Sequence, residues 1–315
     1  MKTRYFVPAS IVVLILGAVA PRIVGNGYVF YAGFIALQYV VIATAWNILG
    51  GYASFVNFGS GAFVGVGVYA AVFLFNALHA PLWGQILGAA CVGGLLGLGM
   101  GYLTLRIQGV YFSIGTLALT TVVSTVIVNW SFVGAARGAT VMAPQPKIWF
   151  PDVVSYVFFA MLTMAVLSVA IARWIERSWI GRGLAAIRAD GSAAECAGVP
   201  TLKLKLLAAT ISGALLATAG APYPYYASYV EPDAAFSISY ALNALAMPLI
   251  GGTRNWTGPV IGALLLSGVE QAATVTIPSE INLLIVGLVL IGFVALAPDG
   301  LLGLASQAIA WGRRR

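Results

Sequence analysis

One carboxylate, Glu270, lies inside a long apolar stretch at 257–276. A carboxylate within a membrane span is costly to bury and usually faces protein or a water-filled cavity rather than lipid. Glu270 is therefore a candidate for the lining of a solute pathway or for a contact between subunits. The simpler alternative is a partly protonated side chain that reaches toward the membrane surface. As a proton- or sodium-coupling group, it would instead indicate transport driven by an ion gradient.

A second set of polar side chains is scattered through apolar sequence. The segment 51–60, GYASFVNFGS, is too polar and too rich in glycine for a lipid-facing helix. Non-helical backbone at membrane depth survives only where protein or a water-filled cavity satisfies its hydrogen bonds. We therefore predict a polar pathway, with the alternative that half of these residues hold helices together, as Ser and Thr commonly do. The set is Asn47, Ser54, Asn57, Ser113, Thr116 and Thr120.

Several other chemistries are disfavoured by what the chain contains. A phosphate-binding loop needs a lysine directly after a glycine, and none of the four lysines follows one. The two cysteines lie in different settings, Cys91 in an apolar run and Cys196 in a polar loop, and the single histidine is His79. This pattern predicts neither a disulfide nor a metal site. An enzyme is the least favoured class, because no nucleophile–base pair is visible.

The composition indicates a membrane protein. Apolar residues make up 61% of the chain and charged residues 8%, whereas soluble domains carry about 25% charged residues. Apolar runs of about 20 residues match helices that cross the bilayer, and they are too long for the strands of an outer-membrane barrel. The predicted fold is an all-α bundle of about ten transmembrane helices, with eight to ten plausible, that includes broken or re-entrant segments.

The apolar stretches predict ten spans. The first resembles a secretory signal that ends in Ala18-Val19-Ala20, but Pro21 should block cleavage there, so we expect an uncleaved span. The span at 238–252 is short, is interrupted by Pro248 and ends in Gly251-Gly252. The predicted spans are 5–24, 28–49, 61–78, 82–105, 111–130, 152–173, 206–224, 238–252, 257–276 and 281–297.

The basic residues predict the orientation. With ten spans, 13 of the 16 basic residues lie on one face, and only Arg22, Arg137 and Lys147 lie on the other. The basic face should be cytoplasmic, which places both termini in the cytoplasm. The net charge of +7 is then a topology signal rather than a nucleic-acid footprint. The basic tail at 313–315 is expected to anchor to lipid headgroups.

Two glycine pairs echo each other along the chain. Ile48-Leu49-Gly50-Gly51 precedes the glycine-rich segment, and Leu249-Ile250-Gly251-Gly252 precedes Gly258-Pro259 and another span. Interrupted hydrophobic segments at corresponding positions of two halves are typical of transporter binding sites. Both segments are therefore candidates for the pathway lining.

The longest polar stretch predicted on the cytoplasmic face is 174–205. It reads as a first short helix at 183–189, a turn at Asp190-Gly191, and a second helix that Ser192 and Glu195 would begin as a capping box. Gly198 and Pro200 should end that second helix. The structured segment is either a capped connector or a docking element for a cytoplasmic partner, which Arg182 and Arg188 would contact.

Several motifs together resemble the LivM-type permeases of branched-chain amino-acid ABC transporters. GVYFSIGTLAL at 109–119 is similar to that family's GxYFAIxTLA stretch, and GRGLAAIRAD at 181–190 with AAE at 193–195 and Gly198 is similar to its cytoplasmic coupling segment. GG at 251–252 with GPVIGA at 258–263, and PDGL at 298–301, follow in family order. The resemblance runs from about residue 45 to 302, and the first two motifs are its most specific parts.

The resemblance implies a single permease domain over 1–315, with 174–205 as a coupling segment inside it. A second, LivH-type permease, two cytoplasmic ATPase subunits and a periplasmic solute-binding protein would be its partners in the bacterial inner membrane. This chain would bind no cofactor, and ATP and Mg would be held by the ATPases. The resemblance also implies that a set of residues in this segment couples the permease to an ATPase. They are Gly181, Arg182, Leu184, Ile187, Arg188, Asp190, Glu195 and Gly198. Tyr111, Gly251 and Gly252 join the predicted pathway, and Glu231 and Asp233 are expected to contact the binding protein.

The sequence also departs from the family pattern beside the predicted pathway. Gly191 stands where an acidic residue is usual, Arg254-Asn255-Trp256 replaces small residues, and 221–226 is rich in proline and tyrosine. These departures bear on the solute, since related permeases carry urea, short amides and other acids. The rival functions are a gradient-driven secondary transporter, with Glu270 as its coupling group, and a membrane scaffold or passive channel.

Overall fold

The protein is an all-α membrane bundle. The computed structural model describes residues 3–23, 27–104, 109–141, 150, 152–276, 287–288, 292 and 300–303. Within these residues, eight helical segments are long and apolar enough to cross a membrane. They are Phe6–Ile23, Gly27–Ala53, Ser60–Leu78, Leu82–Leu103, Val110–Val128, Val153–Arg177, Thr201–Ala227 and Pro232–Gly251. The predicted span 281–297 falls almost wholly outside the described residues, as does the basic tail at 313–315.

The helices agree closely with the predicted spans. The long helices are α1 Thr3–Ile23, α2 Gly27–Ala53, α3 Ser60–Leu78, α4 Leu82–Thr104, α5 Val110–Val128, α6 Val153–Arg177, α9 Thr201–Gly220, α12 Ile238–Gly251 and α13 Thr257–Thr276. The shorter elements are η1 Ser131–Val133, η2 Ala135–Arg137, β1 Ala139–Thr140, α7 Trp179–Ala189, α8 Gly191–Cys196, α10 Tyr223–Ala227, β2 Tyr229–Val230 and α11 Pro232–Ala235. The all-α prediction is thus confirmed.

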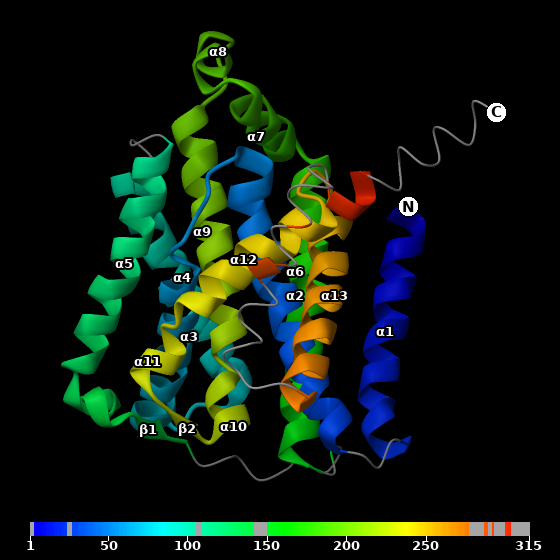
Figure 1. Cartoon of the computed structure of the whole chain (residues 1–315), viewed down its shortest axis with the longest axis vertical. Helices are drawn as coiled ribbons and strands as arrows, with labels where there is room; N and C mark the ends of the chain where they lie inside the picture. Colours follow the sequence, from blue (N-terminus) through cyan, green and yellow to red (C-terminus); the bar gives the residue numbers. More distant parts are fainter. Residues whose placement is uncertain are drawn as a thin grey trace.

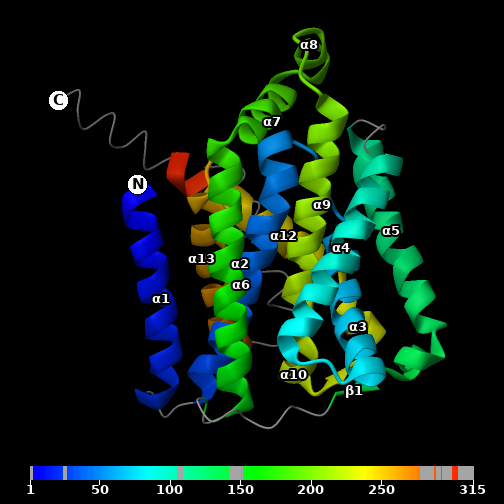
Figure 2. The same cartoon turned by 180° about the vertical axis from the view of Figure 1, so that it is seen from behind.

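Helices α2 and α9 form the centre of the bundle. α2 packs against α6, α9, α12 and α13, and α9 packs against α3 and α4 as well. α1 lies at one edge beside α6, and α5 lies at the opposite edge (Figure 1). α7 and α8, which we call the knob, project from one end of the bundle, and the β1–β2 pair lies at the other (Figures 1 and 2).

The structure corrects the bounds of two predicted spans and one predicted interruption. The span predicted at 206–224 begins instead at Thr201, directly after Pro200, and ends at Gly220. Proline fits a helix start because its missing N–H would be unpaired there anyway. Pro248 does not interrupt α12, which continues to Gly251. A proline within a membrane helix is tolerated when neighbouring groups satisfy the freed carbonyl. α2 also continues four residues beyond the predicted end, to Ala53.

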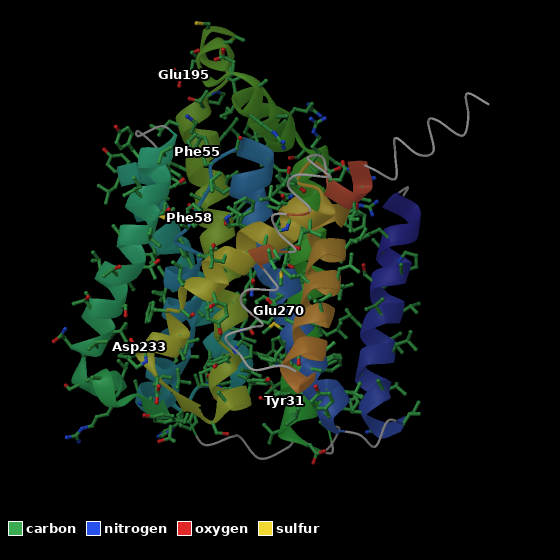
Figure 3. All side chains as sticks on the ribbon, viewed as in Figure 1. Tyr31, Phe55, Phe58, Glu195, Asp233 and Glu270 are labelled. Atoms are coloured by element: carbon green, nitrogen blue, oxygen red, sulfur yellow. The ribbon has the colours of Figure 1, made fainter. Side chains whose placement is uncertain are left out.

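The end opposite the knob is tied together by a small antiparallel pair. Ala139 pairs with Val230 and Thr140 with Tyr229, and the Tyr229 hydroxyl donates to the Arg137 carbonyl at 2.6 Å. This pairing joins the loop after α5 to the loop after α10. Glu231 and Asp233 follow directly and are exposed, and Figure 3 places Asp233 at this end, far from Glu195 of the knob.

Candidate functional site

The chain is not helical between α2 and α3, at 54–59, as the glycine-rich segment predicted. Ser54 adopts a positive φ of 63°, which turns the chain sharply out of α2. The freed backbone is then satisfied locally. The Trp46 indole N–H donates to the Asn57 carbonyl at 2.8 Å, and the Asn57 side-chain oxygen accepts from the Gly59 N–H at 2.7 Å. The break is therefore a fixed structure rather than a loose loop.

Helix α5 supplies further hydrogen bonds to this broken segment. The Thr116 hydroxyl accepts from the Phe58 N–H at 3.1 Å and donates to the Ser113 carbonyl at 2.8 Å. The Ser113 hydroxyl donates to the Val56 carbonyl at 2.9 Å. Ser113 and Thr116 of the YFSIGT motif thus hold the break in place. Their part in solute passage stays a prediction.

Thr116→Val should destabilise the protein. The substitution keeps the shape of the side chain but removes the acceptor of the Phe58 N–H, and an unpaired buried donor costs about 1–3 kcal/mol. We expect a lower midpoint of thermal unfolding in detergent. Thr125→Val on the same helix is the matched control, because the Thr125 hydroxyl is exposed and bonds only within α5, to the Thr121 carbonyl. Equal midpoints for the two variants would contradict the role given to Thr116.

A cavity of about 580 Å³ opens beside the break. It lies between four parts of the chain: the broken segment, the start of α5, the knob and the start of α9. Figure 3 shows Phe55 and Phe58 of the broken segment just below the knob. The lining includes Ser54, Phe55, Val56, Phe58, Gly109, Val110, Phe112, Ser113, Ile187, Asp190, Gly191, Ser192 and Lys205.

The knob consists of two short helices, as predicted, but it is capped differently. α7 begins at Trp179 rather than 183, with the Ser178 hydroxyl accepting from the Gly181 N–H. The capping box predicted from Ser192 and Glu195 is wrong. Asp190 caps α8 instead by accepting from the Ser192 and Ala193 N–H groups.

The two side chains of the predicted capping box therefore do other work. Glu195 accepts a hydrogen bond from the Thr201 hydroxyl and so ties α8 to the start of α9. Hydrogen bonds from the Ser192 hydroxyl, and then from the Ala193 and Ser192 amides, lower the pKa of the Asp190 carboxyl below its usual value. Gly198, at φ 82°, closes α8 as predicted, because glycine adopts that conformation without strain.

The predicted coupling residues divide into an inner and an outer group. Leu184 and Ile187 are buried, and Gly181 lies so close to the Ile175 carbonyl oxygen that a Cβ would approach it to 2.3 Å. Arg182 is exposed. Arg188 donates to the Gly51 carbonyl at 2.5 Å, which connects the knob directly to the last turn of α2, just before the break.

Glu176, at the end of α6, is a residue that sequence reasoning missed. Its carboxylate accepts from the Trp256 N–H at 2.7 Å and from the Tyr52 hydroxyl at 3.5 Å. It therefore links the end of α2 to the loop between α12 and α13. A Cβ on Gly51 would lie 2.8 Å from the Thr253 carbonyl oxygen, so the first glycine pair lies beside the residue that directly follows the second pair.

A second cavity, of about 470 Å³, lies beside this junction. Glu176 and Tyr52 line it together with the arginines of the knob and of the α12–α13 loop, which are Arg182, Arg188 and Arg254. Arg173 stacks behind the junction, with its guanidinium carbon 4.3 Å from the centre of the Phe6 ring and 5.4 Å from that of Trp256. The unusual Arg254-Asn255-Trp256 segment thus forms part of the junction.

Other predicted pathway residues lie outside the first cavity. Glu270 on α13 is hydrogen bonded to Asn243 on α12, and Asn243 donates to the Tyr39 hydroxyl on α2 at 3.1 Å. This cluster joins three helices and is lower in the bundle than the broken segment (Figure 3). Tyr111 is 74% exposed, and its side chain is not among those that line the cavity.

The remaining predicted pathway residues are packed between helices. Asn47 is buried next to Gly51. Thr120 lies beside Gly61 of α3. Gly251 packs against the Gly258 carbonyl, and Gly252, at φ 113°, begins the turn into α13. These positions fit helix packing more directly than contact with a solute.

No metal centre is formed within the described ranges, since no group of three or more His, Cys, Asp or Glu side chains comes together there. Cys91 and Cys196 are both free thiols. The described residues form a cavity, a broken segment between two helices and a projecting knob.

Residues 28–294 match the protein family described as branched-chain amino acid transport system / permease component. The chain belongs to this family. The permease is similar to the high-affinity branched-chain amino acid transport system permease protein LivM of Escherichia coli K12, with 23% identity over 96% of this chain and 75% of LivM. These matches confirm the LivM-type resemblance of the sequence motifs.

The names of other relatives of the permease refer to different solutes. It is 23% identical to the L-arabinose ABC transporter permease protein AraH of Azospirillum brasilense, over 69% of this chain and 64% of AraH. It is 28% identical to the autoinducer 2 import system permease protein LsrC of Enterobacter sp. strain 638, over 71% of this chain and 65% of LsrC. The chain is thus an ABC transporter permease.

The fold of the permease has a counterpart among solved structures. A chain of an ABC transporter in an inward-facing conformation superposes with a TM-score of 0.51, at 16% identity, and the match covers 94% of this chain and all of the other. At this identity the likeness concerns the fold alone.

Proposed function

We propose that this permease is the transmembrane subunit of an importer that moves branched-chain amino acids, or a related small polar solute, across the bacterial inner membrane. The observation that carries the proposal is the cavity shared by the broken helix, the start of α5 and the knob. It places a polar break in a membrane helix next to the segment expected to receive force from an ATPase. The description of the family and the similarity to LivM support the solute class.

The proposed coupling runs through the knob. None of the four lysines follows a glycine, so we assign ATP and Mg to separate ATPase subunits, two of them, of which one docks on the knob. Leu184 and Ile187 anchor α7 to the bundle, while Arg188 holds the Gly51 carbonyl. A displacement of the knob would therefore pull on the last turn of α2, directly before the break.

The proposed orientation places the knob in the cytoplasm. Most of the basic residues belong to that face, and basic residues are enriched on the cytoplasmic side of membrane proteins. α1 begins at the knob end of the bundle (Figure 2). Glu231 and Asp233, at the opposite end, would then face the periplasm and the solute-binding protein. The exposed apolar sides of α1, α4 and α5 are left for lipid and for a second, LivH-type permease.

Purification of the tagged permease from its native membrane in mild detergent tests this proposal. We expect a second permease and two ATPase subunits to co-purify and to be identified by mass. A chain that purifies alone and still moves solute in liposomes would contradict the proposal and would favour the gradient-driven transporter. A complete complex that transports urea or a short amide instead of leucine would leave the assembly intact and change the solute.

A further inference from the structure

Lys205 is a buried cation that the coupling scheme does not use. It lies in the second turn of α9 at the knob end of the bundle and is 8% exposed. Its neighbour Lys203, two residues earlier, is exposed to solvent. The positive-inside rule accounts for a lysine at this end of the helix, but it does not require one whose side chain is turned inward.

The Lys205 side chain lies beside the first cavity, against the ring of Phe55. Its Nζ lies 4.9 Å from the centre of the Phe55 ring, and the residue lines the cavity together with Ser54 and Ser113. A cation–π contact contributes only about 0.5–2 kcal/mol. The ring of Phe55 therefore leaves the ammonium able to bind an anion in the cavity.

Asp190 is the one acidic side chain among the described residues that line this cavity, and it is already engaged. One carboxylate oxygen of Asp190, Oδ1, accepts from the Ser192 N–H at 2.9 Å, the Ser192 hydroxyl at 2.6 Å and the Ala193 N–H at 3.1 Å. Asp190 is exposed at the knob, whereas Lys205 is buried in the bundle. The described residues thus give Asp190 a capping role and leave the ammonium beside the cavity.

The start of α5 adds a second feature that favours an anion. α5 begins at Val110, and Gly109, its N-cap residue, has no side chain that could cap it. The first N–H groups of a helix carry partial positive charge and favour negatively charged ligands. Gly109 and Val110 line the same cavity as Lys205, so two independent elements place positive charge beside it.

We propose that Lys205 and the first turn of α5 form a carboxylate subsite at the inner mouth of the pathway, which holds the carboxylate of the solute as it leaves the bundle. The cavity volume of about 580 Å³ lies within the range of small-molecule sites, about 300–1,000 Å³. Phe55, Phe58 and Phe112 provide an apolar wall for an aliphatic side chain. The subsite rests on the proposed function, because it takes the cavity to be the cytoplasmic exit.

This subsite distinguishes between the solute classes that occur in the family. Amino acids and other small acids carry a carboxylate, whereas a sugar, urea or a simple amide does not. A site that rejects a ligand without the group it binds discriminates more strongly than an apolar pocket does. Lys205 therefore favours an acid or amino acid as the solute of this permease.

The first test is leucine uptake by the complete importer in vesicles. Lys205→Met keeps the apolar stem and removes the charge, and we expect it to lower uptake about tenfold or more, since hydrogen bonds to charged groups are the strong ones. Lys205→Arg should restore most of the uptake. Lys203→Met is the matched control on the same helix and should stay within about twofold of the wild type, because exposed charges contribute little.

The second test measures occupancy without transport. Val110 lines the cavity and is 72% exposed, so Val110→Cys, in a Cys91→Ala/Cys196→Ala background, reports access for a maleimide in the assembled complex. We expect leucine to slow the labelling, and leucinol, which lacks the carboxylate, to leave it unchanged. Adding Lys205→Met should remove the protection by leucine.

The two tests separate failure of the subsite from failure of the proposed function. If the wild type takes up leucine but Lys205→Met matches Lys203→Met in both tests, the subsite is wrong and the function stands. If the wild type does not take up leucine, acetate and isocaproate replace it in the labelling test. Protection that depends on Lys205 would then support the subsite, and no protection by either acid would overturn it. Loss of the ATPase subunits from the Lys205→Met complex would also overturn it, because the cavity would then be a docking groove.

Discussion

Gly262→Val should prevent the normal packing of α12 against α13 and sharply reduce the amount of folded permease. A Cβ at Gly262 would lie 1.8 Å from the Met247 carbonyl oxygen, and one at Gly258 would lie 1.7 Å from the Gly252 carbonyl oxygen. Gly258 and Gly262 form a GxxxG pair, which lets two helix backbones approach closely in a membrane. Because the obstructing atoms belong to the backbone, no side chain can move aside to make room.

The expected cost is at least the upper end of the range for overpacked cores, about 1–3 kcal/mol. Thermal unfolding in detergent and the yield of monodisperse protein measure it. Gly268→Val is the matched control on the same helix, since a Cβ there meets nothing within 4 Å and the change in intrinsic helix propensity is the same. Equal stability of the two variants would contradict the α12–α13 contact described here.

Glu176→Ala is expected to weaken the coupling of ATP hydrolysis to solute uptake while leaving the complex assembled. The carboxylate accepts from the Trp256 N–H at 2.7 Å and from the Tyr52 hydroxyl, so its removal frees the α12–α13 loop from the end of α2. Hydrogen bonds to a charged group contribute about 1.5–3 kcal/mol, which corresponds to a loss of about 10- to 100-fold in coupled uptake.

The Glu176→Gln variant tests whether the acceptor oxygen of this side chain is the property that coupling requires. Glu176→Gln keeps an oxygen that can accept from the Trp256 N–H, and it should retain most of the uptake. ATP hydrolysis and solute uptake are to be measured on the same vesicles. Glu176→Ala should lower the amount of solute moved per ATP, and an unchanged ratio would show that the junction is not part of the coupling route.

The spans and the break at 54–59 could be predicted from the sequence because their signals are local. An apolar run of about 20 residues can form little other than a membrane helix, and a polar, glycine-rich segment within such sequence must find hydrogen-bond partners nearby. α5 provides those partners through Ser113 and Thr116. The predicted pathway residues of the two motifs therefore came together in the structure.

Contacts between distant segments could not be predicted in the same way. Glu176 pairs with a backbone N–H 80 residues later, and no local pattern in a basic stretch identifies that partner. The same limit applies to Glu270, whose contact with Asn243 depends on how α12 and α13 cross. The predicted cap of α8 was wrong for a different reason. Asp190 and Ser192 both suit the first position of a helix, and only the backbone conformation decides which of them caps it.

The count of basic residues uses Lys205 only as an indicator of topology, although the neighbouring residues of α9 indicate that its side chain is buried. Thr201, Leu204, Lys205, Ala208, Ala209 and Ser212 repeat at helical spacing and are all buried. A lysine on a stripe of small residues faces the interior of a bundle, so the periodicity of α9 placed this side chain inward. The net count of basic residues obscured that information.

The central claim is that ATP bound by partner subunits drives solute through this permease. The most direct measurement is leucine uptake by vesicles that contain the purified complex, the solute-binding protein outside and ATP inside. We expect uptake against a gradient that requires both ATP and the binding protein and that continues when proton and sodium gradients are collapsed. Uptake that needs neither ATP nor a partner, and that stops when the ion gradients are collapsed, would contradict it.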